Sequence, residues 1–550
     1  MIMTGAQVIV RFLEDNDVSL VAGIPGGAVL PIYDALATSS RIRHVLVRHE
    51  QAAGFVAQGF ARATGQIGVC LASSGPGATN LVTAVADAQR DSIPLLVITG
   101  QVPRALLGTD AFQEVDARAL ARPVTKFTAL VRHADDLAPI LRQALRMALG
   151  GRPGPVWIDI PRDVQTEMVS ADPEPTATAG TVRPAAPLPQ LVQAANAIAS
   201  ACRPILYLGG GLVSAGAGTL ARALAEREDI PAVMTLMALG VLPKDHPLSL
   251  GMLGMHATQA THAALRETDL LVALGARFDD RATGRLSDFC PTAGVIHVDI
   301  DPRELGKLRT ADIAIEGDLH SVLAALMPLM AGRTRPDWRE RIAQLKRAHP
   351  PAPEGARGPR ALLAAVAQAA PADRIVVTDV GQHQMWVAQH FPLAGPRRFL
   401  TSGGLGTMGF GLPAAIGAAL ARPEECVICF TGDGSLLMNI QELATLREQG
   451  LNIKIIVFDN GGLGLVVQQQ SSFYTAQAFG SRFTSLTDYP AVARGFGIPA
   501  QAADVCAPRE FWEEIFARPG PCLIHVPIDA AAQVLPIVPP GAAHWEAIGA

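Results

Sequence analysis

The chain has 550 residues, of which 49% are hydrophobic and 17% are charged, and its formal net charge is −5. This length exceeds what one hydrophobic core usually organises, so it predicts about three domains, each with a large buried interior. So small a net charge on so long a chain provides no field that would attract nucleic acid or anionic lipid. We therefore expect neither nucleic acid nor a membrane as a partner.

The chain shows no targeting or membrane-spanning segment. Residues 1–14 are apolar and periodic, but they carry Arg11 and Glu14 and lack a small-residue cleavage site, so they predict a first helix and not a signal peptide. The longest apolar candidate, residues 231–243, falls short of the roughly 18 residues that a membrane span needs. The seven cysteines are scattered and odd in number, which suits a reducing compartment. We expect a soluble, cytoplasmic protein.

Cys426 and Cys429 form a C-x-x-C motif, a pattern that elsewhere marks metal or redox sites. Here the motif falls in an apolar segment typical of a buried strand, in which residues three apart point to opposite faces. No second C-x-x-C accompanies it. We interpret both cysteines as core residues.

Two segments, 171–189 and 333–359, are rich in proline and small residues and are expected to be linkers. They divide the chain into predicted domains at residues 1–170, 190–332 and 360–550. Each domain alternates short apolar runs with helical patterns, which predicts three α/β domains with parallel sheets. The clearest predicted strands are residues 68–73, 94–100, 205–208, 270–274, 295–300, 374–378, 426–430 and 453–458.

The first and third domains resemble each other in the order of their elements. In the first, a helix rich in alanine and glycine at residues 52–63 precedes a strand and the turn at 75–77. In the third, a similar helix at 410–421 precedes a strand and the turn at 432–434. The repeat suggests a duplicated fold with different turn chemistry, although similar βα units also arise without duplication.

The most specific local motif is Gly432-Asp433-Gly434, which follows a strand and precedes a helix expected from about Asn439. Glycines let backbone amides approach a diphosphate closely, and the start of a helix adds partial positive charge. Asn460 ends the next strand, so the side-chain oxygens of Asp433 and Asn460 come to one edge of the sheet, as a Mg²⁺ site requires. The alternative interpretation is an ordinary tight turn.

Many co-linear motifs extend this pattern over the whole chain. In chain order they are RHEQAAGFVAQGFARATG, SSGPGATNL, DSIPLLVITGQVP, GTDAFQEVD, GRPGPVWIDIP, GMLGMH, GARFDDRATG, HVDIDP, GQHQMW, SGGLGTMGFGLPAAIGA and DNGGLGLVVQQQ. With these segments the chain resembles the large, catalytic subunits of the acetohydroxyacid synthase (acetolactate synthase) family of thiamine-diphosphate enzymes.

The resemblance implies a pyrimidine-binding, a central flavin-binding Rossmann-like and a diphosphate-binding domain, with thiamine diphosphate, Mg²⁺ and non-redox FAD as cofactors. The implied transferase reaction decarboxylates pyruvate and condenses the hydroxyethyl unit with pyruvate or 2-oxobutyrate. The products are 2-acetolactate and 2-aceto-2-hydroxybutyrate, precursors of isoleucine, valine and leucine. The resemblance also implies a homodimer or homotetramer with active sites at interfaces, and a small regulatory subunit.

Glu50 matches the acid that binds N1′ of the aminopyrimidine of thiamine diphosphate, where a carboxyl assists removal of a proton from the thiazolium ring. A solvated glutamate at a helix start is the alternative. The other implied catalytic residues are Gly27, whose amide would face the reacting carbonyl, and Gln113. The implied substrate residues are Phe112, Met255, Gln469 and Arg281, with a salt bridge to Asp279 or Asp280 as the alternative for Arg281.

The implied cofactor contacts are numerous. Those to thiamine diphosphate are Pro25, Glu50, Pro76, Asn80, Gln382, His383, Gly406, Met408, Gly432, Asp433, Gly434, Ser435, Asn460, Leu463 and Gly464. The implied metal ligands are Asp433, Asn460 and the carbonyl of Gly462. Those to FAD are Arg152, Gly209, Gly210, Gly211, Thr235, Met255, His256, Gly275, Arg277, Asp279, Arg281, Asp299, Ile300 and Asp318. By itself the glycine run is weak evidence for a dinucleotide, because Ser214 replaces the last glycine of G-x-G-x-x-G.

The chain departs from the family at Gln469, where most members have tryptophan within Q-W-Q. The chain instead has QQQ, as an isozyme subgroup of the family does. Tryptophan favours 2-oxobutyrate as acceptor by packing against its extra methyl group, a contact worth about 1–3 kcal/mol in an apolar pocket. We therefore expect weak discrimination between the two acceptors.

Three other functions are compatible with parts of the pattern. A pyruvate oxidase shares the domains and cofactors, but the GARFDDR and GTDAFQEVD segments argue against it. A glyoxylate carboligase is disfavoured because Glu50 is present. A catalytically silent regulatory paralogue is disfavoured by the presence of Glu50, Asp433 and Asn460 together.

Overall fold

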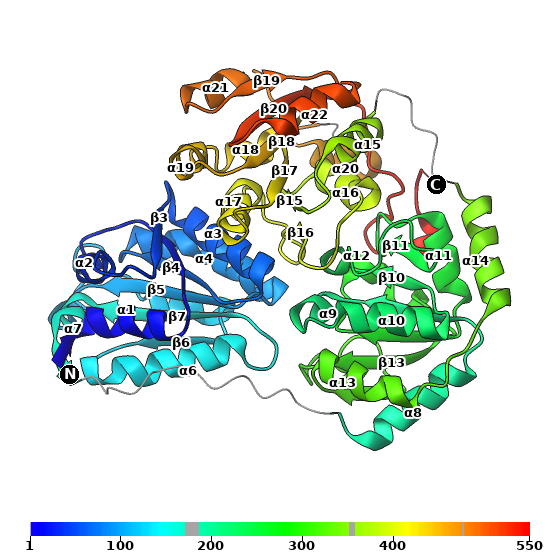
Figure 1. Ribbon diagram of the computed structural model, residues 1–550, viewed down its shortest axis with the longest axis horizontal. Coiled ribbons are helices and arrows are strands. Elements are labelled where there is room, and N and C mark those ends of the chain that lie inside the picture. Colours follow the sequence, from blue (N-terminus) through cyan, green and yellow to red (C-terminus); the bar gives the residue numbers. More distant parts are fainter. Residues whose placement is uncertain (1, 171–185, 351–357, 476–477, 550) are drawn as a thin grey trace.

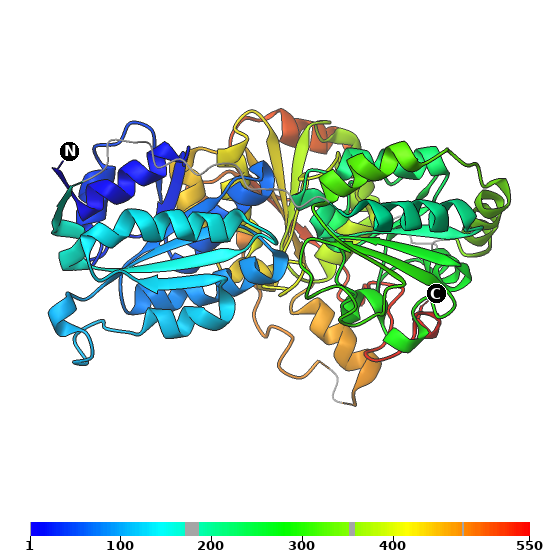
Figure 2. The ribbon, with the colours of Figure 1, turned by 90° about the horizontal axis from the view of Figure 1, so that it is seen from below.

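The computed structural model describes residues 2–170, 186–350, 358–475 and 478–549. It contains three α/β domains, each built on a six-stranded sheet with parallel strand pairs. In Figure 1 the first domain is blue to cyan, the middle domain is green and the third is yellow to red. Figures 1 and 2 show the first and middle domains side by side, with the third domain spanning both.

The first sheet has the strand order β3-β2-β4-β5-β7-β6. Its strands are β2 (Leu20–Gly23), β3 (Arg43–Leu46), β4 (Gly68–Ala72), β5 (Leu95–Gln101), β6 (Phe127–Leu130) and β7 (Pro155–Pro161). Its helices are α1 (Gly5–Asp15), α2 (Leu30–Leu36), α3 (Glu50–Thr64), α4 (Pro76–Asp91), α5 (Ala117–Ala121), α6 (Leu137–Leu149) and α7 (Arg162–Thr166). A small antiparallel pair, β1 (Ile2–Thr4) with β8 (Met168–Ser170), joins the two ends of the domain.

The third sheet has the order β16-β15-β17-β18-β20-β19. Its strands are β15 (Arg374–Thr378), β16 (Phe399–Leu400), β17 (Cys426–Gly432), β18 (Ile453–Asp459), β19 (Ala500–Ala502) and β20 (Cys522–Pro527). Its helices are α15 (Pro359–Ala369), α16 (Gln382–His390), α17 (Gly411–Ala421), α18 (Asp433–Leu437), α19 (Glu442–Gln449), α20 (Gly464–Phe473), α21 (Tyr489–Gly495) and α22 (Arg509–Ala517). Numbered within their own domains, the first and third sheets have the same strand order, as the repeated sequence pattern suggested.

The middle sheet has a different order, β11-β10-β9-β12-β13-β14. This is the order of doubly wound dinucleotide-binding folds. Its strands are β9 (Pro204–Leu208), β10 (Ala232–Met234), β11 (Ser249–Met252), β12 (Leu270–Leu274), β13 (Gly294–Asp299) and β14 (Ile313–Glu316). Its helices are α8 (Leu188–Ser200), α9 (Gly210–Ser214), α10 (Gly218–Glu228), α11 (Gln259–Glu267), α12 (Asp280–Thr283), α13 (Leu319–Leu326) and α14 (Pro336–Ala348).

Three expectations about element boundaries were wrong. The first residues form β1, and the first helix begins only after Thr4, whose side chain accepts a hydrogen bond from the Gln7 amide. In place of one helix from Asn439 the structure has two: α18 begins at Asp433, directly after the extended Gly432, and α19 begins at Glu442. The expected linker at 333–359 contains α14, which buries Trp338 and two aliphatic side chains in the core of the middle domain.

Most of the other linker prediction, residues 171–185 of 171–189, lies outside the described residues. The interpretation of the C-x-x-C cysteines is confirmed, since both are buried on β17 and belong to separate core clusters. Within the described ranges, no helix is long and apolar enough to cross a membrane.

The first and third domains share one continuous hydrophobic core. Helices α3 and α17 lie against each other at its centre, where glycines let their backbones come together. A Cβ added at Gly417 would overlap the carbonyl of Val56, and one added at Gly59 would overlap the carbonyl of Ala414. The contact therefore fixes the two domains relative to each other within one chain.

We expect Gly417→Ala to lower the midpoint of thermal unfolding, because overpacking a tight contact costs about 1–3 kcal/mol. Gly495→Ala is the matched control. It adds the same methyl group to a helix where no atom lies within 4 Å, so we expect no loss of stability there. Equal midpoints for the two variants would contradict the assignment of this contact as a close helix pair.

Candidate active site

The third domain carries a small cavity where its strand order reverses, between β15 and β17. Ligands of open parallel sheets bind at such positions, at the carboxyl ends of the strands. The cavity has a volume of about 130 Å³. Twelve residues with predicted cofactor, metal or substrate roles line it: Gln382, His383, Met408, Gly432, Asp433, Gly434, Ser435, Asn460, Gly462, Leu463, Gly464 and Gln469.

Asp433 stands at the start of α18, directly after β17, and is buried. Its carboxylate accepts hydrogen bonds from the amides of Gly434 at 2.9 Å and Gly462 at 2.8 Å. The hydroxyl of Tyr489 donates to the backbone carbonyl of Asp433 at 3.0 Å. Burial, together with the neighbouring Asp459, raises the pKa of Asp433 to about 7. A cation at this carboxylate would offset the cost of burying its charge.

Asn460 and Gln382 complete the wall beside Asp433. The Asn460 amide donates to Gln382 Oε1 at 2.9 Å, and the buried Asn460 Oδ1 has no hydrogen-bond partner among the described residues. A Cβ at Gly464 would overlap both of these amides, so only glycine leaves this space open. An aspartate oxygen, an unsatisfied amide oxygen and a glycine-lined space fit Mg²⁺ bound together with a phosphate group.

His383, the second residue of α16, lines this cavity next to Gln382. Burial lowers its pKa to about 3, so the imidazole is neutral near pH 7. Its buried Nε2 atom likewise lacks a partner in the part of the chain that the structure describes. A neutral imidazole suits hydrogen bonding to a phosphate better than it suits the role of general acid.

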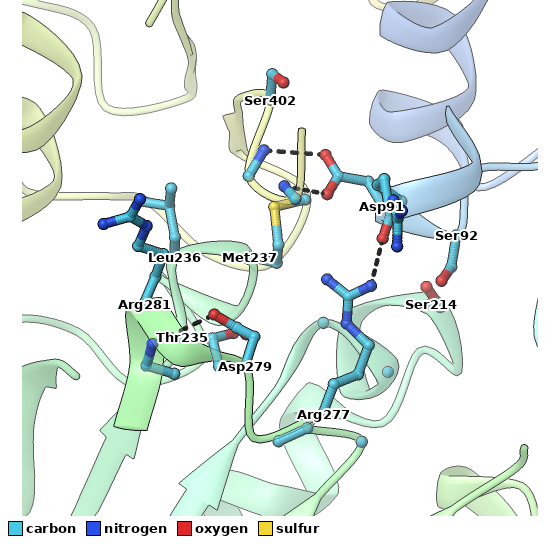
Figure 3. A pocket seen from close by; sticks show the side chains of 18 of the residues that line it. Asp91, Ser92, Ser214, Thr235, Leu236, Met237, Arg277, Asp279, Arg281 and Ser402 are labelled. Atoms are coloured by element: carbon cyan, nitrogen blue, oxygen red, sulfur yellow. Dashed lines mark hydrogen bonds between the residues drawn. The ribbon is translucent and has the colours of Figure 1, made fainter. Parts of the chain in front are cut away.

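A second, larger cavity of about 520 Å³ lies at the junction of the three domains (Figure 3). Its walls include the carboxyl-terminal ends of β9, β10, β12, β13 and β14, and the middle strand order reverses between β9 and β12. Of the predicted flavin contacts it is lined by Arg152, Gly210, Gly211, Thr235, Met255, His256, Gly275, Arg277, Asp279, Arg281, Asp299, Ile300 and Asp318. Gly209 is not in this lining and instead packs its backbone against Gly275.

Two arginines of the second cavity connect domains. Arg277 donates to the carbonyl of Arg90 in the first domain at 2.7 Å, and Arg152 binds Glu304 of the middle domain at 2.8 Å. Arg281 is largely exposed and has its nearest carboxylate, Asp280, at 3.7 Å. The guanidinium of Arg281 is thus available to a ligand, although the weak salt bridge considered from the sequence is also present.

Buried groups in the second cavity also fit a large polar ligand. The Thr235 hydroxyl is buried and has no hydrogen-bond partner within the described residues. Burial raises the pKa of Asp299 to about 6 and lowers that of His256 to about 4. The size, the position at the strand-order reversal and the unsatisfied hydroxyl suit a dinucleotide. The two cavities share Leu465 and Gln469 in their walls.

The predicted residues of the first domain form a third group, around the point where the order of its sheet reverses between β2 and β4. Asn80 donates to Glu50 Oε2 at 2.9 Å, and Gly77 lies close to the other oxygen of Glu50. Gln113, with φ of 61°, packs against Gly75, while Phe112 is 88% exposed.

Within the described chain, none of this first-domain group lines either cavity. The group consists of Pro25, Gly27, Glu50, Pro76, Asn80, Phe112 and Gln113. One chain therefore keeps the acid and the predicted metal ligands in separate sites.

Several residues of the larger cavity were not predicted. Asp91, Leu236, Met237 and the segment 402–405 all line it, and Gly406 follows them. Asp91 and the 402–405 segment fall within motifs that carry the family resemblance. Their place beside the cavity results from contacts between domains, which sequence motifs do not display.

Models of known protein families match most of the chain. Three family models match in chain order: the "Thiamine pyrophosphate enzyme" N-terminal TPP binding domain at residues 3–120, the central domain at 191–326 and the C-terminal TPP binding domain at 379–526. The chain is a thiamine pyrophosphate enzyme with all three domains.

Full-length relatives define the family. The chain is 54% identical to the acetolactate synthase isozyme 1 large subunit of Escherichia coli, covering 99% of this chain and 98% of that protein. It is 46% identical to the isozyme 2 large subunit of the same organism, over 99% of both chains. Identity is 43% to a probable acetolactate synthase large subunit of Methanocaldococcus jannaschii, over 98% and 94% of the two chains. The chain belongs to the acetolactate synthase large-subunit family.

Replacing His383 tests its place in the smaller cavity. We expect His383→Leu, which fills similar space without a polar atom, to weaken thiamine diphosphate binding by about tenfold or more, because a buried hydrogen bond to a charged group is lost. His383→Asn keeps a polar amide and should retain most of the affinity. Calorimetric titration of the cofactor in the presence of Mg²⁺ measures both. Equal affinities of the two variants would show that His383 does not contact the diphosphate.

Proposed function

We propose that this chain is the catalytic subunit of an acetolactate synthase. It decarboxylates pyruvate and joins the two-carbon unit to pyruvate or 2-oxobutyrate, giving 2-acetolactate or 2-aceto-2-hydroxybutyrate for branched-chain amino acid synthesis. The observation that carries the proposal is the set of polar groups at the strand-order reversals of the first and third sheets. The full-length identity to acetolactate synthase large subunits supports the choice of reaction.

We further propose that each active site combines the first domain of one chain with the third domain of another, in a homodimer or homotetramer. The separation of Glu50 from the Asp433 cavity within one chain supports this arrangement. The exposed Phe112 would then be covered by the partner and line the substrate cavity with Gln113. A small regulatory subunit is a further expected partner, since the relatives are large subunits. The cytoplasmic location and the domain boundaries stay predictions.

The residues of the third domain would hold Mg²⁺ and the diphosphate. Asp433, Asn460 and the Gly462 carbonyl are the proposed metal ligands, and Gln382, His383 and Ser435, which line the same cavity, are the proposed phosphate contacts. When bound there, thiamine diphosphate would supply a nucleophilic carbon for pyruvate and a ring system that delocalises the negative charge left by loss of CO₂. Met408 projects from the same cavity wall and would hold the two cofactor rings at an angle.

Glu50 is proposed to move the proton that activates the cofactor. It is the first residue of α3, where the helix dipole favours a negative charge, and Asn80 fixes the orientation of its carboxylate. From this position it would exchange a proton with N1′ of the aminopyrimidine, while the Gly406 carbonyl accepts a hydrogen bond from the 4′-amino group. The Gly27 amide would donate to the reacting carbonyl oxygen.

FAD is proposed for the larger cavity in a structural role. Its walls come from all three domains, so a ligand there would hold the domains together without taking electrons from the substrate. Arg281, at the edge of this cavity and near Met255, is the proposed partner of the acceptor carboxylate.

Turnover tests the function. Purified protein with pyruvate, thiamine diphosphate, Mg²⁺ and FAD should release CO₂ and form acetolactate while the flavin absorbance stays oxidised. Flavin reduction would indicate the pyruvate oxidase alternative, and absence of CO₂ release would indicate a silent paralogue. We expect Glu50→Gln to lower kcat by about 10²-fold or more, because a general acid–base group is lost.

Mixing two inactive variants tests the interface. Glu50→Gln and Asp433→Asn should each be inactive alone. After co-refolding or co-expression, half of the dimers are mixed and each keeps one intact site, so activity should return to about a quarter of the wild-type value. No recovery in dimers shown to be mixed would contradict the proposal that each site is shared between chains.

The acceptor preference is tested at Gln469. Because Gln469 lies in the wall common to both cavities, a larger apolar side chain there should contact the extra methyl group of 2-oxobutyrate. We expect the wild-type protein to form both products at comparable rates from equal acceptor concentrations. Gln469→Trp should raise the ratio of acetohydroxybutyrate to acetolactate by about tenfold. Gln470→Trp, one position along the helix, is the control; the same shift in both variants would contradict this role of Gln469.

A further inference from the structure

We propose that Asp87, Asp91 and Arg62 of the first domain are positioning residues for the cofactor segment, defined as residues 401–409 of the same chain. This inference rests on the proposed function, because it takes Gly406 and Met408 of the cofactor segment to contact thiamine diphosphate. It adds that a chain's own first domain shapes the half-site of its third domain, while its Glu50 serves the other chain.

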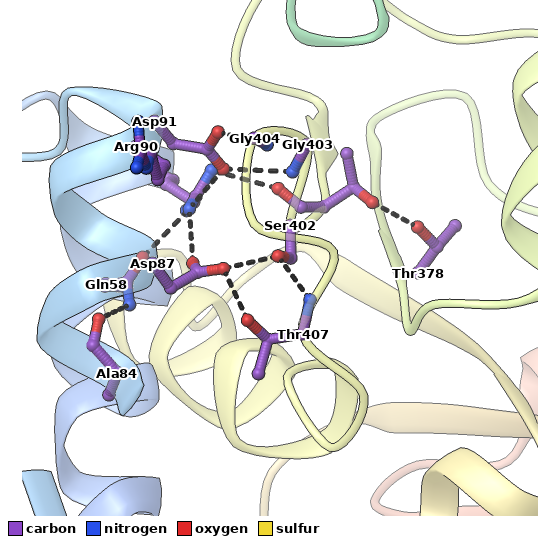
Figure 4. A network of polar contacts seen from close by, with 12 residues as sticks. Gln58, Ala84, Asp87, Arg90, Asp91, Thr378, Ser402, Gly403, Gly404 and Thr407 are labelled. Atoms are coloured by element: carbon purple, nitrogen blue, oxygen red, sulfur yellow. Dashed lines mark hydrogen bonds and ion pairs between the residues drawn. The ribbon is translucent and has the colours of Figure 1, made fainter. Parts of the chain in front are cut away.

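Two aspartates on α4 bind the cofactor segment at several points (Figure 4). Asp91 accepts hydrogen bonds from the amides of Gly403 at 3.0 Å and Gly404 at 2.7 Å. Asp87 accepts from the hydroxyl of Thr407 at 3.0 Å and makes a short hydrogen bond with the hydroxyl of Ser402. The residues held in this way lie on both sides of Gly406, so their contacts fix the direction of its carbonyl.

Arg62 on α3 supports both aspartates and the cofactor segment. Its guanidinium binds Asp87 at 3.1 Å and Asp91 at 2.9 Å, and it donates to the carbonyl of Thr401 at 3.0 Å. The same group lies over the ring of Phe410, 5.0 Å from its centre. Arg62 thereby connects α3 and α4 with the start of the cofactor segment and with Phe410, directly after its end.

The network is buried. The side chains of Asp87 and Asp91 are fully buried and that of Arg62 is 5% exposed. The guanidinium of Arg62 is one positive charge facing the carboxylates of Asp87 and Asp91. Burial raises the pKa of Asp87 to about 6. The hydroxyls and amides of the cofactor segment supply the remaining hydrogen bonds that the second negative charge needs. Moving the segment away would leave a buried charge short of donors, which is why its position is firmly held.

Asp379 of the third domain holds the far end of the cofactor segment, accepting from the amides of Gly409 and Gly411 at 2.9 Å each. Met408 therefore lies between Thr407, fixed by the first domain, and Gly409, fixed by the third. The first domain thus contributes a restraint that the third domain does not supply alone.

The directions of α3 and α4 separate this role from that of Glu50. Both helices begin near the Glu50–Asn80 pair and end near Arg62 and Asp91. A change at the far ends of the helices should act on the cofactor bound by the same chain's third domain. It should leave the Glu50 half of the other site intact.

The first test removes hydroxyls and leaves the ion pairs in place. In Ser402→Ala/Thr407→Val we expect the thiamine diphosphate concentration for half-saturation to rise by about tenfold, as two buried hydrogen bonds are lost. Amide hydrogen exchange of residues 402–408 in the cofactor-free protein should accelerate, since the segment loses its anchors. Thr99→Val is the matched control. It removes a buried hydroxyl that donates to buried Asp159 at 2.7 Å elsewhere in the first domain, and it should change neither quantity.

An unchanged half-saturation concentration and unchanged exchange in the double variant would overturn the inference. An equal effect of Thr99→Val on both quantities would also overturn it, because the contacts would then only stabilise the fold in general. Neither readout requires turnover.

The second test uses mixed dimers. Asp87→Asn should lower cofactor affinity by about tenfold or more. At a thiamine diphosphate concentration too low to saturate Asp87→Asn alone, mixing it with Glu50→Gln should restore activity to the level reached by the Glu50→Gln and Asp433→Asn pair. One site of each mixed dimer then receives an intact Glu50 and an intact cofactor segment. Recovery by the Asp433 pair without recovery by the Asp87 pair would overturn the inference. If neither pair recovers, the shared-site proposal fails, and the exchange and affinity measurements decide the inference alone.

Discussion

The close contact between α3 and α17 is the constraint on which the rest of the structure depends. Gly59 and Gly417 let the two helix backbones meet, and a common core forms around them. This contact joins the first and third domains of one chain rigidly, yet it leaves Glu50 outside the cavity that Asp433 lines. The proposed reaction needs both groups in one site, so under that proposal another chain would supply one of them.

The shared strand order of the first and third sheets explains why two such half-sites exist. In each sheet the strand order reverses beside the strand that comes first in the chain, between β2 and β4 in the first sheet and between β15 and β17 in the third. The turns at these positions have diverged in chemistry. The first contains Gly75 with a positive φ of 56°, and the third contains Asp433 at a helix start. Under the proposed function, one architecture thus provides both a proton-transferring half and an anion- and metal-binding half.

Sequence alone predicted the parts that depend on local pattern. The strands at Leu270–Leu274 and Arg374–Thr378 match the predicted residues, because continuous apolar runs bounded by turns mark buried parallel strands. Helix α14 was missed because its buried side chains, such as Trp338, are few within a polar, proline-flanked segment. The roles of Asp87 and Asp91 were missed for another reason. Their partners lie more than 300 residues away in the chain, and no local pattern encodes such a contact.

The buried polar groups around the cofactor segment and the smaller cavity differ in whether their hydrogen bonds are satisfied within the protein. Asp87, Asp91 and Asp379 have their oxygens occupied by hydroxyls, amides or Arg62, so their contacts are complete without a ligand. Asn460 Oδ1 and His383 Nε2 are also buried, but the described structure offers them no partner. Leaving such atoms unsatisfied costs about 1–3 kcal/mol each. Under the proposed function a bound ligand would recover that cost, whereas the contacts of Asp87, Asp91 and Asp379 would keep the surrounding segment in the shape that the ligand needs.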